Sequence, residues 1–517
     1  MRAITLLMLL SCKGKDAASV SSDEADSDSD TDADTDADTD ADTDTDTYDD
    51  GYDPEEESPY IALEPVAVDD NIYIANPDRN SLTRVSIADL SALTAEIGPN
   101  PSVMVASDPY GAVVILDTGL DEVHIVDATS LELQAVPIRP HLNQLQLSPD
   151  GRWALCYYQA EAPADHDTSG AWSYSEVSVV DITSGVDWPQ SVGFEPAQIQ
   201  FSQTGDAVLV SDSWLVHLDL RGDEPVLTRI QIEDTVEPPE AEEVLVTPDG
   251  QYAIVRQYGV SDLILVDLVS GETDVLAAGD NPTDLDVTPD GTRAMAVARG
   301  SSEVWIYDLA VPEALPEVMP LPVDTVLGSI SISDTGDTAI LYSTAAGEPR
   351  FVSWDLLAPD QTDAFTTHGT VKSIESVHMA PGVRSALIVH PKEDHKDIDE
   401  DSPFQGAPAI TIVDLDDYFT NALRLSAVPA GITFSEDGQY AFFYLEDLPY
   451  LESVDLDAML LDEINLLSNP AHIGVFPGSH TAYASQAHEL GRLSFYDAQT
   501  AELQTITGFE LNASIDQ

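Results

Sequence analysis

Short alternating or apolar runs, separated by turn residues, occupy most of the chain after residue 58. From Glu242 onward the order is an alternating run EEVLV, a turn TPDG, an apolar run YAIV, a third run LILVD and a weaker fourth run TDVLAA. A period of two residues and short apolar runs between turns are typical of β-strands. The pattern predicts units of four strands, and the scarcity of a 3.6-residue apolar period argues against helical solenoids.

The turn after the first strand of each unit recurs along the chain. Proline before Asp-Gly fixes φ at about −65° and glycine adopts a positive φ, so the chain reverses tightly. The copies are Pro149-Asp150-Gly151, Gln203-Thr204-Gly205, Pro248-Asp249-Gly250, Pro289-Asp290-Gly291, Asp334-Thr335-Gly336 and Glu436-Asp437-Gly438.

An aspartate ends the third strand of nearly every unit. Copies stand at Asp127, Asp181, Asp219, Asp267, Asp308, Asp355, Asp414, Asp455 and Asp497, a mean spacing of about 46 residues. An earlier unit from Asn71 lacks the aspartate and brings the count to ten. At a strand-to-turn junction an Asp side chain accepts backbone N–H bonds, so these residues are expected to stabilise turns rather than form a binding array.

Four strands repeated at this length are the signature of a β-propeller blade. The repeats resemble those of bacterial propellers of the YVTN and tryptophan-aspartate-like kind, in which an SPDG turn precedes an apolar strand and a VxVxD strand. The resemblance implies an all-β propeller of about ten four-stranded blades over residues 58–517, with two smaller propellers as the alternative. Lactonases share this family, but none of their site residues matches a position here.

The end of the chain suggests how the ring closes. GFELNASIDQ from Gly508 resembles GFEPAQIQFS from Gly193, which opens a unit. We therefore expect Asn512 to Asp516 to supply the innermost strand of the first blade, which would cover two exposed sheet edges. The alternative strand for that position is Tyr60 to Val66.

The first residues resemble a bacterial lipoprotein signal. Arg2 precedes an apolar stretch from Ala3 to Leu10, which is too short to span a bilayer. Leu9-Leu10-Ser11-Cys12 resembles the lipobox, which implies cleavage of residues 1–11 and lipidation of Cys12. Because Lys13 rather than Asp follows, the resemblance implies an outer-membrane lipoprotein of the cell envelope, on either the periplasmic or the surface side.

Charge changes the picture in two ways. Residues 12–57 alternate Asp with Thr, Ala or Ser and carry almost nothing apolar, which predicts a disordered acidic linker. The net charge is −76, of which residues 58–517 contribute −59. Nucleic acid binding needs clustered Lys and Arg, so a nucleic acid partner is excluded.

Two units carry insertions between their second and third strands, a place where rigid scaffolds present binding groups. The first, Gln159 to Ser175, offers candidate binding residues Asp165, His166, Asp167, Trp172 and Tyr174. The second, Pro391 to Pro408, follows His390 and offers hard oxygen ligands suited to Ca²⁺. The candidate metal ligands are Asp397, Asp399, Asp401, His390 and His395, and the alternative is a solvated acidic loop.

No catalytic signature such as HExxH, GxSxG or GxxxxGK occurs. Cys156 lies on an apolar second strand and is expected to be a small buried side chain. The resulting hypothesis is a lipid-anchored envelope propeller that acts as a scaffold or binds a protein, peptide or glycan. The alternative is an envelope hydrolase or lactonase of the propeller type, with Ca²⁺ as a candidate cofactor.

Overall fold

The computed structural model describes most of the chain after residue 61. The described residues are 62–160, 174–235, 237–312, 314–322, 326–345, 347–358, 364–393, 398 and 401–511. The chain divides between Asp53 and Pro54 into two units, and every described residue belongs to the second. The predicted signal peptide, Cys12 and the acidic linker lie outside the described residues.

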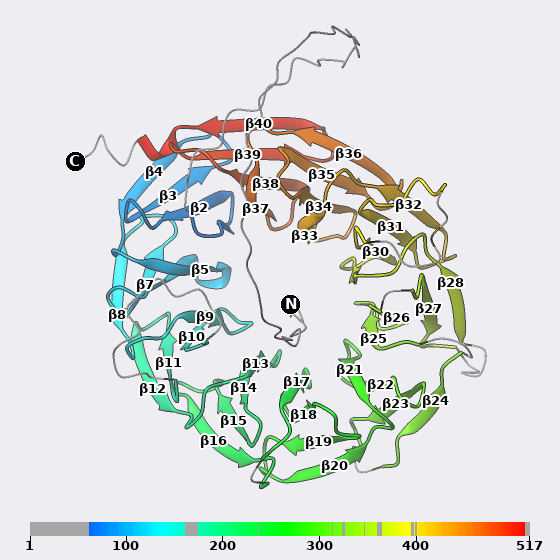
Figure 1. Cartoon of the computed structure of the whole chain (residues 1–517). Coiled ribbons are helices and arrows are strands. Elements are labelled where there is room, and N and C mark those ends of the chain that lie inside the picture. Colours follow the sequence, from blue (N-terminus) through cyan, green and yellow to red (C-terminus); the bar gives the residue numbers. More distant parts are fainter. Residues whose placement is uncertain are drawn as a thin grey trace, which may run out of the picture. The chain divides into compact units, whose positions relative to one another are not determined.

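The described residues form ten sheets, and each sheet is an antiparallel meander of four strands consecutive in the chain. Figure 1 shows these sheets as blades around one ring, from blue to red in chain order. We number them blades 1 to 10. The prediction of an all-β propeller with ten four-stranded blades is confirmed, and the alternative of two smaller propellers is wrong.

The first five blades contain strands β1 to β20 and one short 3-10 helix. Their bounds are β1 (Val66–Val68), β2 (Asn71–Asn76), β3 (Ser81–Ser86) and β4 (Ala92–Glu96); β5 (Pro101–Ser107), η1 (Asp108–Tyr110), β6 (Ala112–Asp117), β7 (Glu122–Asp127) and β8 (Leu133–Pro137); β9 (Gln144–Leu147), β10 (Trp153–Tyr157), β11 (Glu176–Asp181) and β12 (Val186–Ser191); β13 (Gln198–Phe201), β14 (Asp206–Val210), β15 (Trp214–Asp219) and β16 (Val226–Gln231); β17 (Ala241–Val246), β18 (Tyr252–Gln257), β19 (Asp262–Asp267) and β20 (Thr273–Ala277).

The second five blades contain strands β21 to β40 and a 3-10 helix near the end. Their bounds are β21 (Pro282–Val287), β22 (Arg293–Ala298), β23 (Glu303–Asp308) and β24 (Glu317–Pro320); β25 (Ser329–Ile332), β26 (Thr338–Tyr342), β27 (Arg350–Asp355) and β28 (Phe365–Gly369); β29 (Ser376–Met379), β30 (Ser385–His390), β31 (Ala409–Asp414) and β32 (Thr420–Arg424); β33 (Pro429–Phe434), β34 (Tyr440–Leu445), β35 (Tyr450–Asp455) and β36 (Leu460–Asn465); β37 (Pro470–Val475), β38 (Thr481–Gln486), β39 (Arg492–Asp497), β40 (Glu502–Thr507) and η3 (Phe509–Leu511).

The predicted turns between first and second strands are present, and a repeated set of hydrogen bonds holds them. In blade 5, Asp249 Oδ1 accepts from Thr247 Oγ1 at 2.6 Å and from the backbone N–H of Gln251 at 3.0 Å. Gly250 follows with φ of 69°, which is the left-handed region that glycine adopts without strain. The same Ser/Thr-to-Asp hydrogen bond recurs in blades 3, 6 and 9, so a short local motif explains the recurrent PDG-type signal.

Burial follows the position of a strand within its blade. The second strands β6 and β30 are buried at every residue because neighbouring blades pack on both faces of the sheet. The fourth strands β8 and β20 form the outer edge and bury a single residue each. This explains why second strands appear in the sequence as unbroken apolar runs and fourth strands give only a weak signal.

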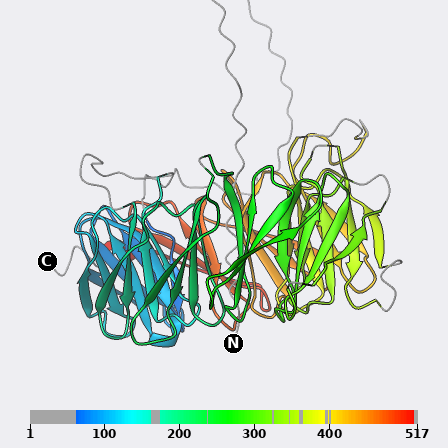
Figure 2. The same ribbon diagram turned by 90° about the horizontal axis from the view of Figure 1, so that it is seen from below.

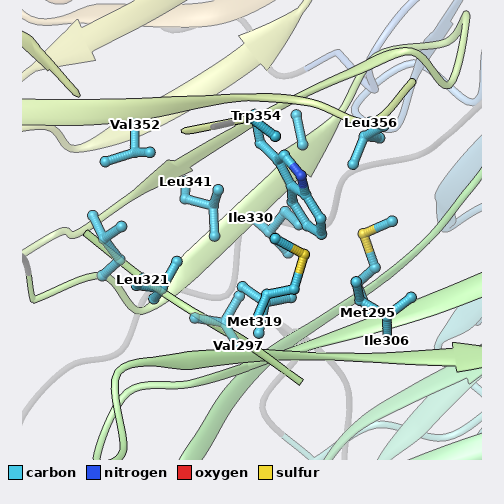
Figure 3. Close-up of a cluster of buried hydrophobic side chains, with 14 residues drawn as sticks. Met295, Val297, Ile306, Met319, Leu321, Ile330, Leu341, Val352, Trp354 and Leu356 are labelled. Atoms are coloured by element: carbon cyan, nitrogen blue, oxygen red, sulfur yellow. The ribbon is translucent and has the colours of Figure 1, made fainter. Parts of the chain in front are cut away.

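The core is divided among the interfaces between blades. Ten clusters of buried apolar side chains occur among the described residues, and each joins one blade to the next. Figure 3 shows the cluster between blades 6 and 7, where Met295 and Ile306 of blade 6 face Trp354 and Leu356 of blade 7. Each blade is therefore stabilised mainly by contact with its neighbours.

The ring closes between blade 10 and blade 1. Ile72 and Ile74 of β2 share an apolar cluster with Phe476, Phe495 and Phe509. Across the same interface, the guanidinium of Arg79 donates to the carbonyl oxygens of Glu510 at 2.8 Å and Glu489 at 3.2 Å. These contacts join the two ends of the described chain.

The predicted closing strand is wrong. The position beside β2 is taken by β1, in which Val66 pairs with Tyr73 and Val68 with Asn71. The backbone N–H of Leu63 also donates to Ala75 O at 3.0 Å. The chain just before the first blade therefore supplies the innermost strand, close to the alternative segment Tyr60–Val66, and Asn512–Asp516 is not needed for that position.

The meander places its connections on two opposite faces of the ring. The turns between first and second strands and between third and fourth strands lie on one face, here called the turn face. The connections between second and third strands, and those between blades, lie on the other, here called the loop face. Figure 2 shows the ring edge-on, with the strands running between these two faces.

Candidate functional site

Both predicted insertions connect a second strand to a third strand, so their described ends lie on the loop face. The first follows β10 in blade 3 and the second follows β30 in blade 8, which are opposite blades in a ring of ten. Asp165, His166, Asp167 and Trp172 lie outside the described residues, whereas Tyr174 is described and 49% exposed. The structure therefore places the base of this loop on the expected face and leaves the role of its tip a prediction.

The base of the second insertion is held by a buried lysine. Lys372 is fully buried in the connection between blades 7 and 8. Its ammonium donates to the carbonyl oxygens of Lys392 at 2.8 Å and Ala407 at 2.9 Å, which stand at the two ends of the insertion. A buried charge is costly unless it is well hydrogen-bonded, so this contact fixes where the loop leaves the ring.

His390 occupies the adjacent position at the end of β30. It is buried, its Nδ1–H donates to Ser373 O at 2.8 Å, and its Nε2 accepts from Thr411 Oγ1 at 2.7 Å. Burial lowers the pKa of His390 to about 4, so the ring is neutral at neutral pH. Both ring nitrogens are used in the protein, and a metal ion would have to displace one of these partners.

The calcium hypothesis for the second insertion stays a prediction. Asp397, Asp399 and His395 lie outside the described residues, while Asp401 is exposed. Among the residues that the structure does describe, no three His, Cys, Asp or Glu side chains are grouped so that they could hold a metal ion.

The recurrent third-strand aspartates stabilise turns, as predicted. Asp127 Oδ1 accepts from the backbone N–H groups of Thr129 at 3.0 Å and Ser130 at 2.7 Å. The backbone and hydroxyl hydrogen bonds of Ser130 lower the pKa of Asp127. Equivalent backbone bonds occur at all nine positions, so these carboxylates belong to the scaffold.

Cys156 is also structural. It is fully buried in the cluster between blades 2 and 3, and burial raises the pKa of its thiol. The prediction of a small buried side chain is confirmed.

A group of carboxylates on the innermost strands was not predicted. Glu242 and Glu243 of β17 flank Arg256 of β18, and Arg256 Nε donates to Glu243 Oε2 at 2.9 Å. On the next blade, Asp284 and Asp286 of β21 point along the ring toward blade 7. Four carboxyl groups thus lie on two neighbouring innermost strands, and Arg256 pairs with two of them, Glu242 and Glu243.

The two aspartates of β21 connect blade 6 to blade 7. Asp284 Oδ2 accepts from the backbone N–H of Ile330 at 2.7 Å, and Asp286 Oδ2 accepts from that of Ile332 at 3.0 Å. Similarly, Gln200 Oε1 of blade 4 accepts from the backbone N–H of Val246 in blade 5 at 2.7 Å. Because innermost strands have no ladder partner on their inner side, these side chains satisfy backbone groups of the following blade.

The surroundings of these carboxylates favour their neutral forms. Burial, with the nearby charge of Glu243, raises the pKa of Asp284 well above its ordinary value. Burial also raises the pKa of Asp286 to about 7. Burial likewise raises the pKa of Glu243, although Arg256 opposes that effect. At neutral pH this group can therefore hold a proton that ordinary carboxyls have released.

The sequence did carry a signal for this group. The first strands EEVLV and TDLDV contain acidic residues at polar positions, whereas the positions of Asp284 and Asp286 are held by Ser329 and Ser331 in blade 7. Alternation showed only that these residues lie on one face of a strand. It could not show that the face points toward the next blade, which requires the closed ring.

Comparisons with known proteins identify the fold alone. No protein-family model matches the chain, and no curated protein matches it significantly. Among solved structures, one of a eukaryotic initiation factor has a TM-score of 0.50 at 12% identity, covering 80% of this chain and 97% of that chain. At such identity the likeness shows a shared architecture and nothing about activity.

Two further solved structures match this chain with lower TM-scores. Dihydro-heme d1 dehydrogenase NirN in complex with DHE gives a TM-score of 0.44 at 18% identity, covering 75% of this chain and 78% of that chain. Hydrazine synthase from Kuenenia stuttgartiensis gives 0.37 at 16% identity, covering 60% of this chain and 95% of that chain. Within the described part of the present chain, no helix is long and apolar enough to cross a membrane.

Proposed function

We propose that this protein is a lipid-anchored β-propeller of the cell envelope that acts as a binding scaffold for a protein, peptide or glycan. Lipidation at Cys12 would attach it to the outer membrane, and the acidic linker of residues 12–57 would hold the ring away from the bilayer. The ring would then present its loop face to the ligand.

The observation that carries this proposal is the base of the blade 8 insertion. A fully buried lysine, one of five in the chain, donates to carbonyl oxygens at both ends of that loop. Ordering the base in advance lowers the entropy cost of binding through the loop, because fewer residues must be fixed when a ligand arrives. A loop that served only to connect two strands would need far fewer residues than the 18 from Pro391 to Pro408.

Cross-linking in intact cells tests the binding role. Partners captured by the wild-type protein are compared with those captured by a variant in which a short Gly-Ser linker replaces the tip of the blade 8 insertion. A matched control keeps the loop at its full length and replaces exposed residues of outer strands, such as Leu93 and Leu503. Loss of partners in the loop variant alone supports the proposal, and an unchanged set of partners contradicts it.

The anchor has its own test. We expect the mature protein to carry a diacylglycerol-modified cysteine by mass spectrometry and to sediment with the outer membrane. The variant Cys12→Ala should lose both the lipid mass and the membrane fractionation. A wild-type protein that is soluble and unmodified would refute the lipid anchor without affecting the test of the loop.

A second function is favoured by one observation, the group of carboxylates with raised pKa values on β17 and β21. A protonated carboxyl beside ionised ones is the arrangement that acid catalysis requires, and such groups cluster at functional sites. An envelope hydrolase or lactonase would use Asp286 as the acid. Hydrolysis of a panel of esters and lactones that Asp286→Asn abolishes, while Asp274→Asn retains it, would favour the enzyme.

A further inference from the structure

A cavity opens on the turn face between blades 7 and 8. Its volume is about 420 Å³, within the range of about 300 to 1,000 Å³ that is usual for small-molecule sites. Most of the side chains that line it are polar. One of them is Ser353, which stands two residues before the end of β27 and is only 2% exposed. The cavity therefore holds a hydroxyl group on its inner wall, away from bulk solvent.

This hydroxyl is hydrogen-bonded to a histidine of the neighbouring strand. Ser353 Oγ lies 2.8 Å from His368 Nε2 of β28, whereas the backbone oxygen of Thr366 is 3.4 Å away, so the imidazole is the better acceptor. Burial lowers the pKa of His368, which keeps the ring neutral at neutral pH and able to accept. A hydroxyl that donates to a neutral imidazole is the pairing that activates a serine nucleophile.

Two aromatic rings hold the imidazole in place. The ring of His368 stacks on that of Phe351 with centroids 4.8 Å apart, and the ring of Tyr418 from blade 8 lies 4.8 Å from it. In a Ser-His-Asp triad a carboxylate orients the base. Burial alone accounts for the lowered pKa of His368, so no carboxylate among the described residues has that role here. The pair is a dyad whose base is oriented by ring packing.

The charged groups of the cavity restrict which substrates fit. Arg384 of blade 8 lines the cavity, pairs with Asp337 and Asp416, and donates to Leu415 O at 3.0 Å. A guanidinium has more N–H groups than these three partners use, so it can also donate to the oxygen of a reacting carbonyl. Asp355 adds a further carboxylate to the wall. Because three aspartates outnumber one arginine, an anionic substrate is disfavoured.

We infer that the cavity between blades 7 and 8 is an esterase site for small, uncharged or cationic carboxylic esters, with Ser353 as the nucleophile and His368 as the general base. The site uses neither the blade 8 insertion nor the carboxyl groups of β17 and β21. It is therefore independent of both functions proposed above.

The reaction needs only the ester and water. Ser353 Oγ bonds to the carbonyl carbon while its proton passes to His368 Nε2. The bond between that carbon and the alcohol oxygen then breaks, and His368 gives the proton to the leaving alcohol. Water attacks the acyl-serine and gives a proton to His368, which returns it to Ser353 Oγ as the carboxylic acid leaves. The net change is ester and water to acid and alcohol.

The chain supplies a matched control for this dyad. Ser376 Oγ and His378 Nε2 are also 2.8 Å apart. Both belong to the innermost strand β29, and neither lines the cavity. Ser376→Ala therefore removes the same kind of hydrogen bond without changing the proposed site.

The test measures hydrolysis of p-nitrophenyl acetate and p-nitrophenyl butyrate by the full chain. A fluorophosphonate, which reacts with activated serines, is added separately, and peptide mass spectrometry locates the labelled residue. We expect Ser353→Ala to lower kcat/KM by at least about a hundredfold and to abolish labelling, and Ser376→Ala to change kcat/KM by less than about twofold. The rate should increase with pH as a group ionises whose pKa lies below the ordinary histidine value, because burial lowers the pKa of His368.

Several outcomes would overturn the inference. A wild-type protein that neither hydrolyses the esters faster than buffer nor carries the label on Ser353 has no esterase site here. Hydrolysis that survives Ser353→Ala, or that Ser376→Ala reduces equally, would mean that the dyad is structural. Hydrolysis that Asp286→Asn abolishes and Ser353→Ala retains would assign the activity to the carboxyl groups of β17 and β21 instead. Labelling of the wild type needs no variant, so a folding defect in Ser353→Ala would not decide the result.

Discussion

Substitution of Asp286 should change how the stability of the ring depends on pH. In the folded protein burial raises the pKa of this carboxyl from 3.8 to about 7. Between these two values the folded state binds a proton that the unfolded chain has released. The contribution of Asp286 to stability is therefore fully present below about pH 4 and is lost as the pH rises through 7.

The size of the effect follows from the shift. About three pKa units at 1.36 kcal/mol each give about 4 kcal/mol as an upper limit. Asp286 is not completely shielded from solvent, so screening reduces this to about 2 kcal/mol. The unfolding free energy of the wild type should fall by about that much more than that of Asp286→Asn between about pH 4 and pH 8. Asp284 and Glu243 have raised pKa values too, so the variant should retain part of the slope.

Urea denaturation followed by tryptophan fluorescence measures this difference. A salt concentration of about 0.5 M screens the repulsion among the many other carboxylates. Asp274→Asn is the matched control, because it removes the same formal charge from an exposed position on β20. The reasoning is refuted if Asp286→Asn keeps the wild-type slope, or if the control flattens the slope equally.

Three other changes test separate parts of the structure. Lys372→Met should cost about 1 to 3 kcal/mol of unfolding free energy, because the carbonyls of Lys392 and Ala407 lose their donor. The control Lys392→Met, at an exposed side chain, should leave stability against urea unchanged. A chain ending at Leu511 should be as stable as the full chain. A chain ending at Thr507 should lose about 3 to 5 kcal/mol of unfolding free energy, because it lacks the buried Phe509. Equal losses in both would instead support Asn512–Asp516 as the closing strand. Glu452→Gln should stabilise the protein by about 2 to 5 kcal/mol more at pH 9 than at pH 4. The reason is that burial, aided by the charge of Glu463, raises the pKa of Glu452 to about 8. In addition, Glu452 Oε2 has no hydrogen-bond partner among the described residues. A constant difference across that range would contradict the assignment of a buried, proton-binding carboxyl.

The sequence by itself determined the repeating unit. Turns such as Pro248-Asp249-Gly250 and third-strand aspartates such as Asp127 act through hydrogen bonds within three residues, so their roles can be inferred without knowing any distant contact. Likewise, an unbroken apolar run at a second strand indicates that both faces of that strand are buried between neighbouring blades. Blade number, strand number and the role of the recurrent aspartates were predictable for that reason.

Only the tertiary structure decided what depends on neighbouring blades. The innermost strand of blade 1 comes from Val66–Val68 rather than from the C-terminal segment, because two segments of similar pattern competed for one edge and local sequence could not rank them. The carboxylates of β17 and β21 and the lysine beneath the blade 8 insertion join residues from different blades or connections. Their proximity arises from closure of the ring, which ten interfaces produce together and which no single repeat encodes.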